Sequence, residues 1–241
     1  MQSSYPIYWA GAESRRSTSP HRKPTEGPEE VMVRDFVSRL QVKTARGCRV
    51  ALFKEPWLQS GAPDLVAVLW RPSRMSSWSP ARAEINASDL RLLHWLTSVS
   101  SAELCRIREL FGKPSEESLR RLEQADMINL TTRRVKARPL AALFAIERIY
   151  AIEAKVSHLP KGLEQAALNL WFAQESYILV PQVPRGSVFF DTALDLGVGV
   201  WCAADATLDA RASSATDGKP LSYASWLFNE WLWRAEVRLP K

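Results

Sequence analysis

The chain has 241 residues, of which 46% are hydrophobic and 24% are charged, and its formal net charge is +6. These proportions are typical of a soluble globular protein with one large domain or two small ones. No apolar run approaches the roughly 20 residues that a membrane-spanning helix needs, so a membrane protein is not expected. The positive charge favours a polyanionic partner such as a nucleic acid. An acidic lipid surface would suit the charge too, but the sequence has no basic amphipathic helix to bind one.

Three cysteines, Cys48, Cys105 and Cys202, are far apart in the sequence and stand in apolar or helical contexts. A disulfide framework or a cysteine-based zinc site would need closer, paired spacing. The N-terminus also lacks the basic stretch and apolar segment of a secretory signal. We therefore expect reduced, structural thiols in a cytoplasmic protein.

Residues 1–27 are predicted to form a flexible basic arm. The segment from Ser14 to Pro24 is rich in Ser, Pro, Arg and Lys and contains no aliphatic residue, so it buries too little surface to fold by itself. It is either a basic tail that touches a phosphate backbone or a solvated leader, and the second interpretation is preferred.

A helix is predicted to begin at Pro28. Proline suits a first helical turn, and the acids Glu29 and Glu30 complement the positive end of the helix dipole. Apolar residues then recur at helical spacing from Val33 to Leu40. Glu30 lies near the edge of this apolar face, and its simplest interpretation is a first-turn charge. A strand is predicted next, at Arg49–Phe53.

The segment Gly61–Trp70 brings a Pro-Asp pair to the start of an unbroken apolar strand. Pro63 cannot donate a hydrogen bond to a neighbouring strand, so it belongs at the strand's start. Asp64 is then the first side chain of that strand. It is either a turn cap or, because a carboxylate here leads a buried strand, an ion ligand.

From about residue 84 to residue 138, three helices and a basic hairpin are predicted. The expected capping residues are, in chain order, Ser88 or Asp89, Ser100 or Ser101, and Ser115. The segment Met127–Arg138 mixes apolar with polar or basic residues, as a short β-ribbon does.

This block resembles a winged helix-turn-helix domain. Ser101–Gly112 matches the second helix and its turn, Ser115–Gln124 matches the recognition helix, and residues 125–138 match the wing. The resemblance implies that Arg120 and Arg121 approach the major groove of DNA. It also implies phosphate contacts from the basic residues of the wing, which are Arg133, Arg134, Lys136 and Arg138. Many domains of this kind bind proteins instead, and that alternative stays open.

A central apolar strand, Arg148–Lys155, ends in Glu-Ala-Lys. Alternate residues of a strand share one face, so Glu153 and Lys155 point the same way. The simplest interpretation is an ion pair at the strand's end. In a metal-dependent phosphodiester hydrolase, the acid would instead hold a cation and the lysine would steady the attacking water. A helix over residues 161–175 is predicted to follow, with Lys161 and Gln165 on a face directed toward this strand end.

The later elements are predicted as strands at Tyr177–Val180 and Gly197–Ala204, a short helix at Phe189–Leu196 and a final helix at Tyr223–Arg234. The aromatic residues of the final helix are interpreted first as core and second as a surface for a partner or for base stacking. No other catalytic set competes, because the three histidines are scattered and none stands beside a serine or cysteine in a nucleophile setting. No glycine-rich phosphate loop is present, so no nucleotide cofactor is expected.

Without residues 84–138, the predicted order of elements resembles the PD-(D/E)xK superfamily of nucleases, which includes restriction endonucleases. The matching residues are Pro63-Asp64 and Glu153-Ala154-Lys155, with Gln165 on the next helix. The resemblance covers about residues 28–70 and 148–205; in the simplest members the two half-motifs are close in sequence, whereas here a block separates them. It implies an α/β fold whose mixed central sheet is flanked by helices, built from residues 28–83 and 139–241, with a small winged helix-turn-helix domain inserted at 84–138.

The resemblance implies a Mg²⁺-dependent DNA endonuclease in which Mn²⁺ can replace Mg²⁺. Asp64, Glu153 and the backbone carbonyl of Ala154 would bind the metal. Lys155 would orient the attacking water, and Gln165 would help to place it. Glu30, or else Glu29, would be the first-helix acid that binds a second ion or a metal-bound water. A homodimer or a larger complex acting in restriction, phage defence or mobile elements fits this function; the alternative is a non-catalytic DNA-binding or regulatory subunit with the same fold.

Overall fold

A computed structural model describes residues 7–9, 27–58, 61–210 and 221–238. Apart from a short strand and Gly27, the predicted flexible arm lies outside the described residues. The chain divides into two compact units, which we describe separately: a first unit of residues 1–70 and 147–220, and a second unit of residues 71–146 and 221–241. No helix among the described segments has the length and apolar character needed to cross a membrane.

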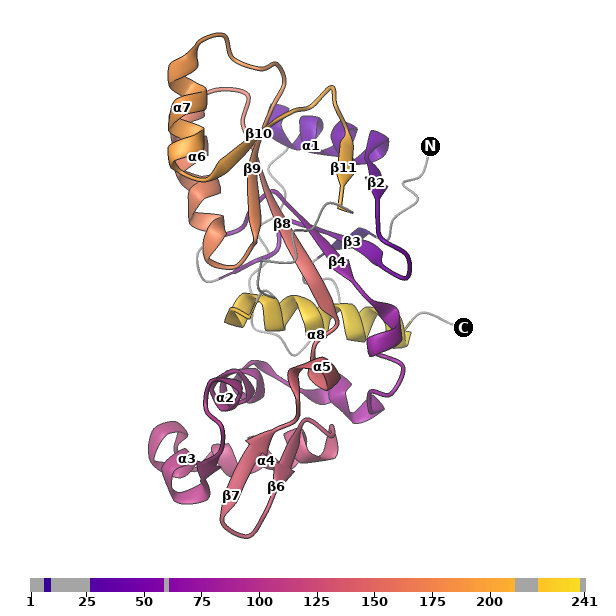
Figure 1. The fold of residues 1–241 in the computed structure, drawn as a ribbon, viewed down its shortest axis with the longest axis vertical. Coiled ribbons are helices and arrows are strands. Elements are labelled where there is room, and N and C mark those ends of the chain that lie inside the picture. Colours follow the sequence, from indigo (N-terminus) through magenta and orange to yellow (C-terminus); the bar gives the residue numbers. More distant parts are fainter. Residues whose placement is uncertain (1–6, 10–26, 59–60, 211–220, 239–241) are drawn as a thin grey trace. The chain divides into compact units, whose positions relative to one another are not determined.

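The first unit is built on a mixed six-stranded sheet (Figure 1). Strands β3 and β4 are antiparallel, whereas β1 and β3, β8 and β9, and β9 and β10 are parallel pairs. In spatial order the strands are β1 (Ile7–Trp9), β3 (Arg49–Lys54), β4 (Leu65–Trp70), β8 (Ile146–Ala154), β9 (Glu175–Val180) and β10 (Val198–Cys202). The predicted mixed central sheet is therefore confirmed.

Helices flank both faces of this sheet, as predicted (Figure 1). On one face, helix α1 (Pro28–Arg39) buries Phe36 against Trp201, with ring centroids 4.9 Å apart. A small two-stranded sheet, β2 (Gln41–Lys43) with β11 (Thr207–Asp209), joins the same core. On the other face, α6 (Leu159–Leu168) and α7 (Ser187–Asp195) pack against β9 and β10.

Strand alternation decides which side chains reach the helix α6 face. In β9, Leu179 belongs to the core under α1, whereas Ile178 and Val180 belong to the core under α6. In β8, Ile152 and Ala154 contribute to the α1-side core. Glu153 lies between them in the strand, so its side chain is directed toward the opposite face, where α6 begins.

Helix α6 is shorter than the predicted helix over residues 161–175. A 3₁₀ turn, Asn169–Trp171, ends it, and Glu175 already belongs to β9. The side chain of Gln174 accepts a hydrogen bond from the backbone N–H of Ile149, and Glu175 forms an ion pair with Arg148. These bonds tie residues 174 and 175 to β8, which the helical spacing of the alanines did not reveal.

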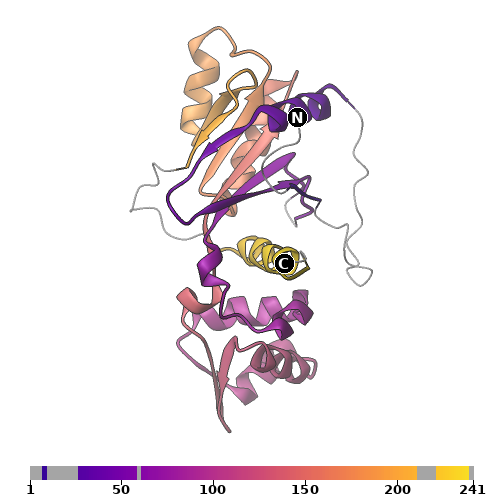
Figure 2. The ribbon, with the colours of Figure 1, turned by 90° about the vertical axis from the view of Figure 1, so that its right-hand side faces the viewer.

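The second unit contains the three helices and the hairpin that were predicted for residues 84–138 (Figure 2). The helices are α2 (Ala87–Ser98), α3 (Leu104–Phe111) and α4 (Ser115–Gln124), and an antiparallel sheet has the order β5 (Ala102–Glu103), β7 (Arg134–Ala137), β6 (Ile128–Leu130). Strand β5 was not predicted. The unit also holds two 3₁₀ turns, η1 (Pro72–Arg74) and η2 (Pro80–Glu84), and the short helix α5 (Leu140–Leu143).

All three predicted helix caps are wrong. Helix α3 follows Glu103, and neither Ser100 nor Ser101 caps it. The cap of α2 is Asn86, whose side chain accepts hydrogen bonds from the N–H groups of Ser88 and Asp89. Asp89 returns the bond by accepting from the N–H of Asn86, which completes a capping box. Ser115 is the first residue of α4 rather than its cap, and its hydroxyl donates to the carbonyl of Gly112.

The final helix, α8 (Tyr223–Arg238), belongs to the second unit and not to the sheet-based core in which the sequence placed it. Glu230 pairs with Arg82, and Asn229 bonds to the backbone of Ala145 and Leu143. Residues 71–83 and 139–146 join the same unit, so both predicted domain boundaries differ from the observed division. Trp226 and Phe228 are fully buried, which confirms the core interpretation of these two aromatics.

Candidate functional site

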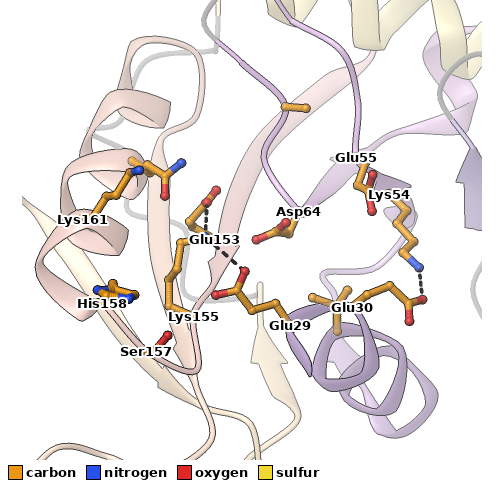
Figure 3. A pocket seen from close by; sticks show the side chains of 13 residues that line it. Glu29, Glu30, Lys54, Glu55, Asp64, Glu153, Lys155, Ser157, His158 and Lys161 are labelled. Atoms are coloured by element: carbon orange, nitrogen blue, oxygen red, sulfur yellow. Dashed lines mark hydrogen bonds and ion pairs between the residues drawn. The ribbon is translucent and has the colours of Figure 1, made fainter. Parts of the chain in front are cut away.

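A cavity of about 480 Å³ in the first unit lies where α1, the end of β3, the start of β4, the end of β8 and the start of α6 meet (Figure 3). All five residues that the sequence analysis named as catalytic line this cavity, namely Glu30, Asp64, Glu153, Lys155 and Gln165. The expectation that two segments far apart in the sequence converge on one site is therefore confirmed.

Asp64 is held directly against the second half-motif. Its Oδ2 accepts a hydrogen bond of 2.7 Å from the backbone N–H of Ala154, between Glu153 and Lys155. Burial raises the pKa of Asp64, and the charges of Glu29 and Glu55 add to the rise against the opposing effects of the Ala154 hydrogen bond and the Lys155 charge. Asp64 is thus part of the site, and the turn-cap interpretation does not account for this contact with Ala154.

Glu153 and Lys155 form the ion pair expected at the end of β8, with 3.0 Å between Oε1 and Nζ. Glu153 is only 5% exposed. Burial, and then the charge of Asp64, raise the pKa of Glu153 to about 7 even though Lys155 opposes this. Burial by itself lowers the pKa of Lys155, but the surrounding carboxylates outweigh it and the pKa is raised overall. The lysine is therefore a firmly protonated cation among more carboxylate charge than it can neutralise.

The structure separates the two acids at the start of α1. Glu30 is held by Lys54, with 2.6 Å between Oε1 and Nζ, and by Arg34, and the bond from Lys54 lowers the pKa of Glu30. Glu29 instead places its Oε2 3.6 Å from Nζ of Lys155. Figure 3 shows the Glu29 carboxylate directed toward Glu153 and Lys155, while Glu30 turns away toward Lys54. Of the two candidates, Glu29 is the acid at the centre of the site.

The start of α6 supplies the polar side of the cavity near Lys155. Lys161 and Gln165 both line it, one helical turn apart, as the sequence predicted. His158, one of the three scattered histidines, also lines the cavity and precedes α6 in a left-handed conformation with φ of 52°.

Two charged lining residues, Lys54 and Glu55, were not identified from the sequence. The hairpin of β3 and β4 brings them to the site, because Lys54 lies opposite Leu65 and the N–H of Glu55 donates to the carbonyl of Asp64. The sequence did carry one signal for these two residues. The first predicted strand ends just before them, and the strand that begins with Pro-Asp follows shortly after. Glu55 also has φ of 45°, which is uncommon for a residue other than glycine.

The donor chemistry of the site fits a hard divalent cation. Among the described residues, no three His, Cys, Asp or Glu side chains are grouped closely enough to hold a metal ion by themselves. The set implied by the resemblance has only two carboxylates, those of Asp64 and Glu153, together with the Ala154 carbonyl. The raised pKa values of both acids reflect buried negative charge, which oxygen-ligated Mg²⁺ would neutralise.

No protein-family model, curated protein or solved structure matches this chain. The function must therefore be inferred from the residues themselves.

The predicted DNA-contacting residues of the second unit fall into two groups. Three are already in ion pairs: Arg121 binds the fully buried carboxylate of Asp89 through two bonds of 2.8 Å, Arg120 binds Glu117, and Arg138 binds Asp126. Arg121 thereby joins α4 to α2, which is a structural role. The exposed pairs of Arg120 and Arg138 contribute little energy and leave both side chains accessible.

The second group consists of Arg133, Arg134 and Lys136, at and beside β7. All three are exposed, and within the described ranges of the chain no acidic side chain pairs with them. Arg134 and Lys136 alternate in β7 with the buried Val135 and Ala137, so they share the exposed face of this strand, and Arg133 comes just before it.

Proposed function

We propose that this protein is a Mg²⁺-dependent endonuclease that hydrolyses phosphodiester bonds of DNA, with a core of the PD-(D/E)xK kind. The convergence of Asp64, Glu153 and Lys155 in one cavity carries this proposal. Two buried acids with raised pKa values beside a protonated lysine make a poor structural pair, because burial of unbalanced charge destabilises a fold. Such an arrangement is typical of functional sites.

Each residue has a role that follows from its position. Asp64, Glu153 and the Ala154 carbonyl would hold Mg²⁺, with Mn²⁺ as a substitute; the ion supplies a Lewis acid and an activated water. Lys155 stays protonated at neutral pH, so it acts as a hydrogen-bond donor that stabilises negative charge on the phosphate, and not as the general base. Glu29 positions the ammonium group of Lys155, and Gln165 offers an amide to orient water or the DNA backbone.

Within the second unit, residues 84–138 are proposed to be a winged helix-turn-helix module that contacts DNA. The order α2, β5, α3, α4, β6, β7 and the sheet order β5-β7-β6 support this proposal. Gly112, with φ of 73°, ends α3 and allows the sharp turn into α4. The hairpin residues Arg133, Arg134 and Lys136 supply the positive charge that phosphate contacts need.

Purified protein incubated with supercoiled and linear DNA is expected to cut both with Mg²⁺ and neither with EDTA. Lys155→Ala should lower the cleavage rate by about 10²–10³-fold, the usual effect of removing one preorganised donor from a transition state, while leaving DNA binding unchanged. DNA binding that is insensitive to EDTA, with no cleavage under any metal condition, would instead support the non-catalytic alternative.

A further inference from the structure

Helix α6 approaches the stem of Lys155 more closely than any residue with a side chain would allow. A Cβ atom built on Gly162 would lie 2.5 Å from Cγ and 3.3 Å from Cβ of Lys155, and 2.8 Å from Cδ1 of Ile178. Distances below 3.0 Å are essentially never seen for real Cβ atoms. The Lys155 side chain thus occupies the space that a side chain at position 162 would need.

The backbone gives no other reason for glycine at this position. Gly162 lies inside α6 and is absent from the residues with positive φ. Glycine inside a helix destabilises it by about 0.5–1 kcal/mol relative to alanine, and the neighbouring α6 positions Ala166 and Ala167 show that alanine suits this helix. The remaining reason for glycine at position 162 is the close approach of α6 to Lys155 and Ile178.

The contact between Gly162 and the Lys155 stem matters because a lysine side chain is otherwise mobile, with a flexible chain of four carbons between the backbone and the charged nitrogen. The backbone N–H of Lys155 is fixed by a 2.9 Å bond to the carbonyl of Leu179. From there the stem runs beside Gly162, and the ammonium group reaches Glu153 and Glu29 with only 13% of the side chain exposed. Figure 3 shows Lys155 between the α6 side that carries Lys161 and the Glu29 carboxylate.

We propose that Gly162 is a positioning residue for Lys155, which directs the ammonium group toward the reacting phosphate by leaving room for the lysine stem against α6. The catalytic consequence rests on the proposed nuclease function. A purely structural role would lower stability without changing the activity of each folded molecule. A positioning role moves the ammonium group, and a displacement of about 1 Å can lower a rate by about 10²-fold.

The test compares Gly162→Ala with the matched control Gly199→Ala. A Cβ at Gly199, on β10, would lie 2.4 Å from the ring of Tyr177, so this variant carries a similar clash away from the cavity. Gly162→Ala is expected to lower kcat at least about tenfold with little change in KM, and to shift the side-chain NMR signals of Lys155 in isotope-labelled protein. Gly199→Ala is expected to lower only the stability.

A second variant separates positioning from packing. Ile178→Val removes the Cδ1 atom that an alanine at 162 would strike, so Gly162→Ala with Ile178→Val should regain stability yet keep the low kcat and the shifted Lys155 signals. Recovery of kcat together with stability, or unchanged Lys155 signals in Gly162→Ala, would overturn the proposal. If the wild-type protein cuts no DNA, the nuclease proposal fails, and the Lys155 signals still decide whether Gly162 positions the lysine.

Discussion

Replacing Glu153 with glutamine is expected to remove DNA cleavage and to make the protein more stable at pH 8. The loss of cleavage follows from the loss of a metal ligand. A bound metal contributes several kcal/mol to transition-state stabilisation, and about 1.4 kcal/mol corresponds to a factor of ten in rate. Glu153→Gln should therefore lower the cleavage rate by at least about 10²–10³-fold.

The gain in stability follows from the raised pKa of Glu153, which burial and Asp64 bring from its ordinary value of 4.5 to about 7. Between these two values the folded protein binds a proton more tightly than the unfolded chain, so the stability of the wild-type protein falls as the pH rises from 4.5 to 7. Glutamine carries no such penalty. At pH 8 the variant should be more stable by roughly 3 kcal/mol, and the difference should vanish near pH 4.

Urea-induced unfolding in EDTA at pH 4 and pH 8 measures this difference. The control is Glu164→Gln on the exposed side of α6, which should stay within about 0.5 kcal/mol of the wild-type protein at both values. A Glu153→Gln protein that is less stable than the wild-type at pH 8 would show that Glu153 serves mainly as the structural partner of Lys155.

Replacing Arg82 with alanine is expected to destabilise the second unit by about 3–5 kcal/mol. Arg82 and Glu230 are each 1% exposed, and Nε and Nη2 of the arginine reach the two carboxylate oxygens at 2.9 and 2.6 Å. The guanidinium also donates to the carbonyl of Leu143 and lies 3.4 Å from the ring centroid of Trp78. Its removal leaves a buried carboxylate without its charge partner.

The double variant Arg82→Met with Glu230→Leu should be more stable than Arg82→Ala, because it removes both buried charges and keeps apolar volume. Unfolding can be followed by tryptophan fluorescence, with Arg106→Ala as the control, since Arg106 forms an exposed pair with Glu109 that contributes at most about 1 kcal/mol. If Arg82→Ala and Arg106→Ala lower the stability equally, the buried pair does not hold α8 to the rest of the second unit.

The sequence predicted the elements whose signals are local. Continuous apolar runs located β4, β8 and β9, and the order of half-motifs indicated that Asp64, Glu153 and Lys155 share a site. The choice between Glu29 and Glu30 was not predictable, because consecutive helix residues differ by about 100° in direction and the rotation of α1 depends on packing. Lys54 decides that choice by binding Glu30. The pairing of β3 with β4 is what brings Lys54 to the site.

The place of α8 could not be predicted for a similar reason. Its aromatic residues indicate burial but not the partner, and the residues that fix the partner, Arg82 and Glu230, are distant in sequence. Gly162 also carried no signal by itself, since a glycine inside a helix shows its role only when the side chain opposite is known.

Titration of the protein with Mn²⁺, followed by the EPR signal of the free ion, tests the central claim most directly. Wild-type protein is predicted to bind Mn²⁺ at one site, Asp64→Asn to bind it at least about tenfold more weakly, and Glu30→Gln, whose native carboxylate is already neutralised by Lys54, to bind it as the wild-type does. Equal Mn²⁺ binding by wild-type and Asp64→Asn proteins would contradict the claim that Asp64 and Glu153 hold one cation beside Lys155.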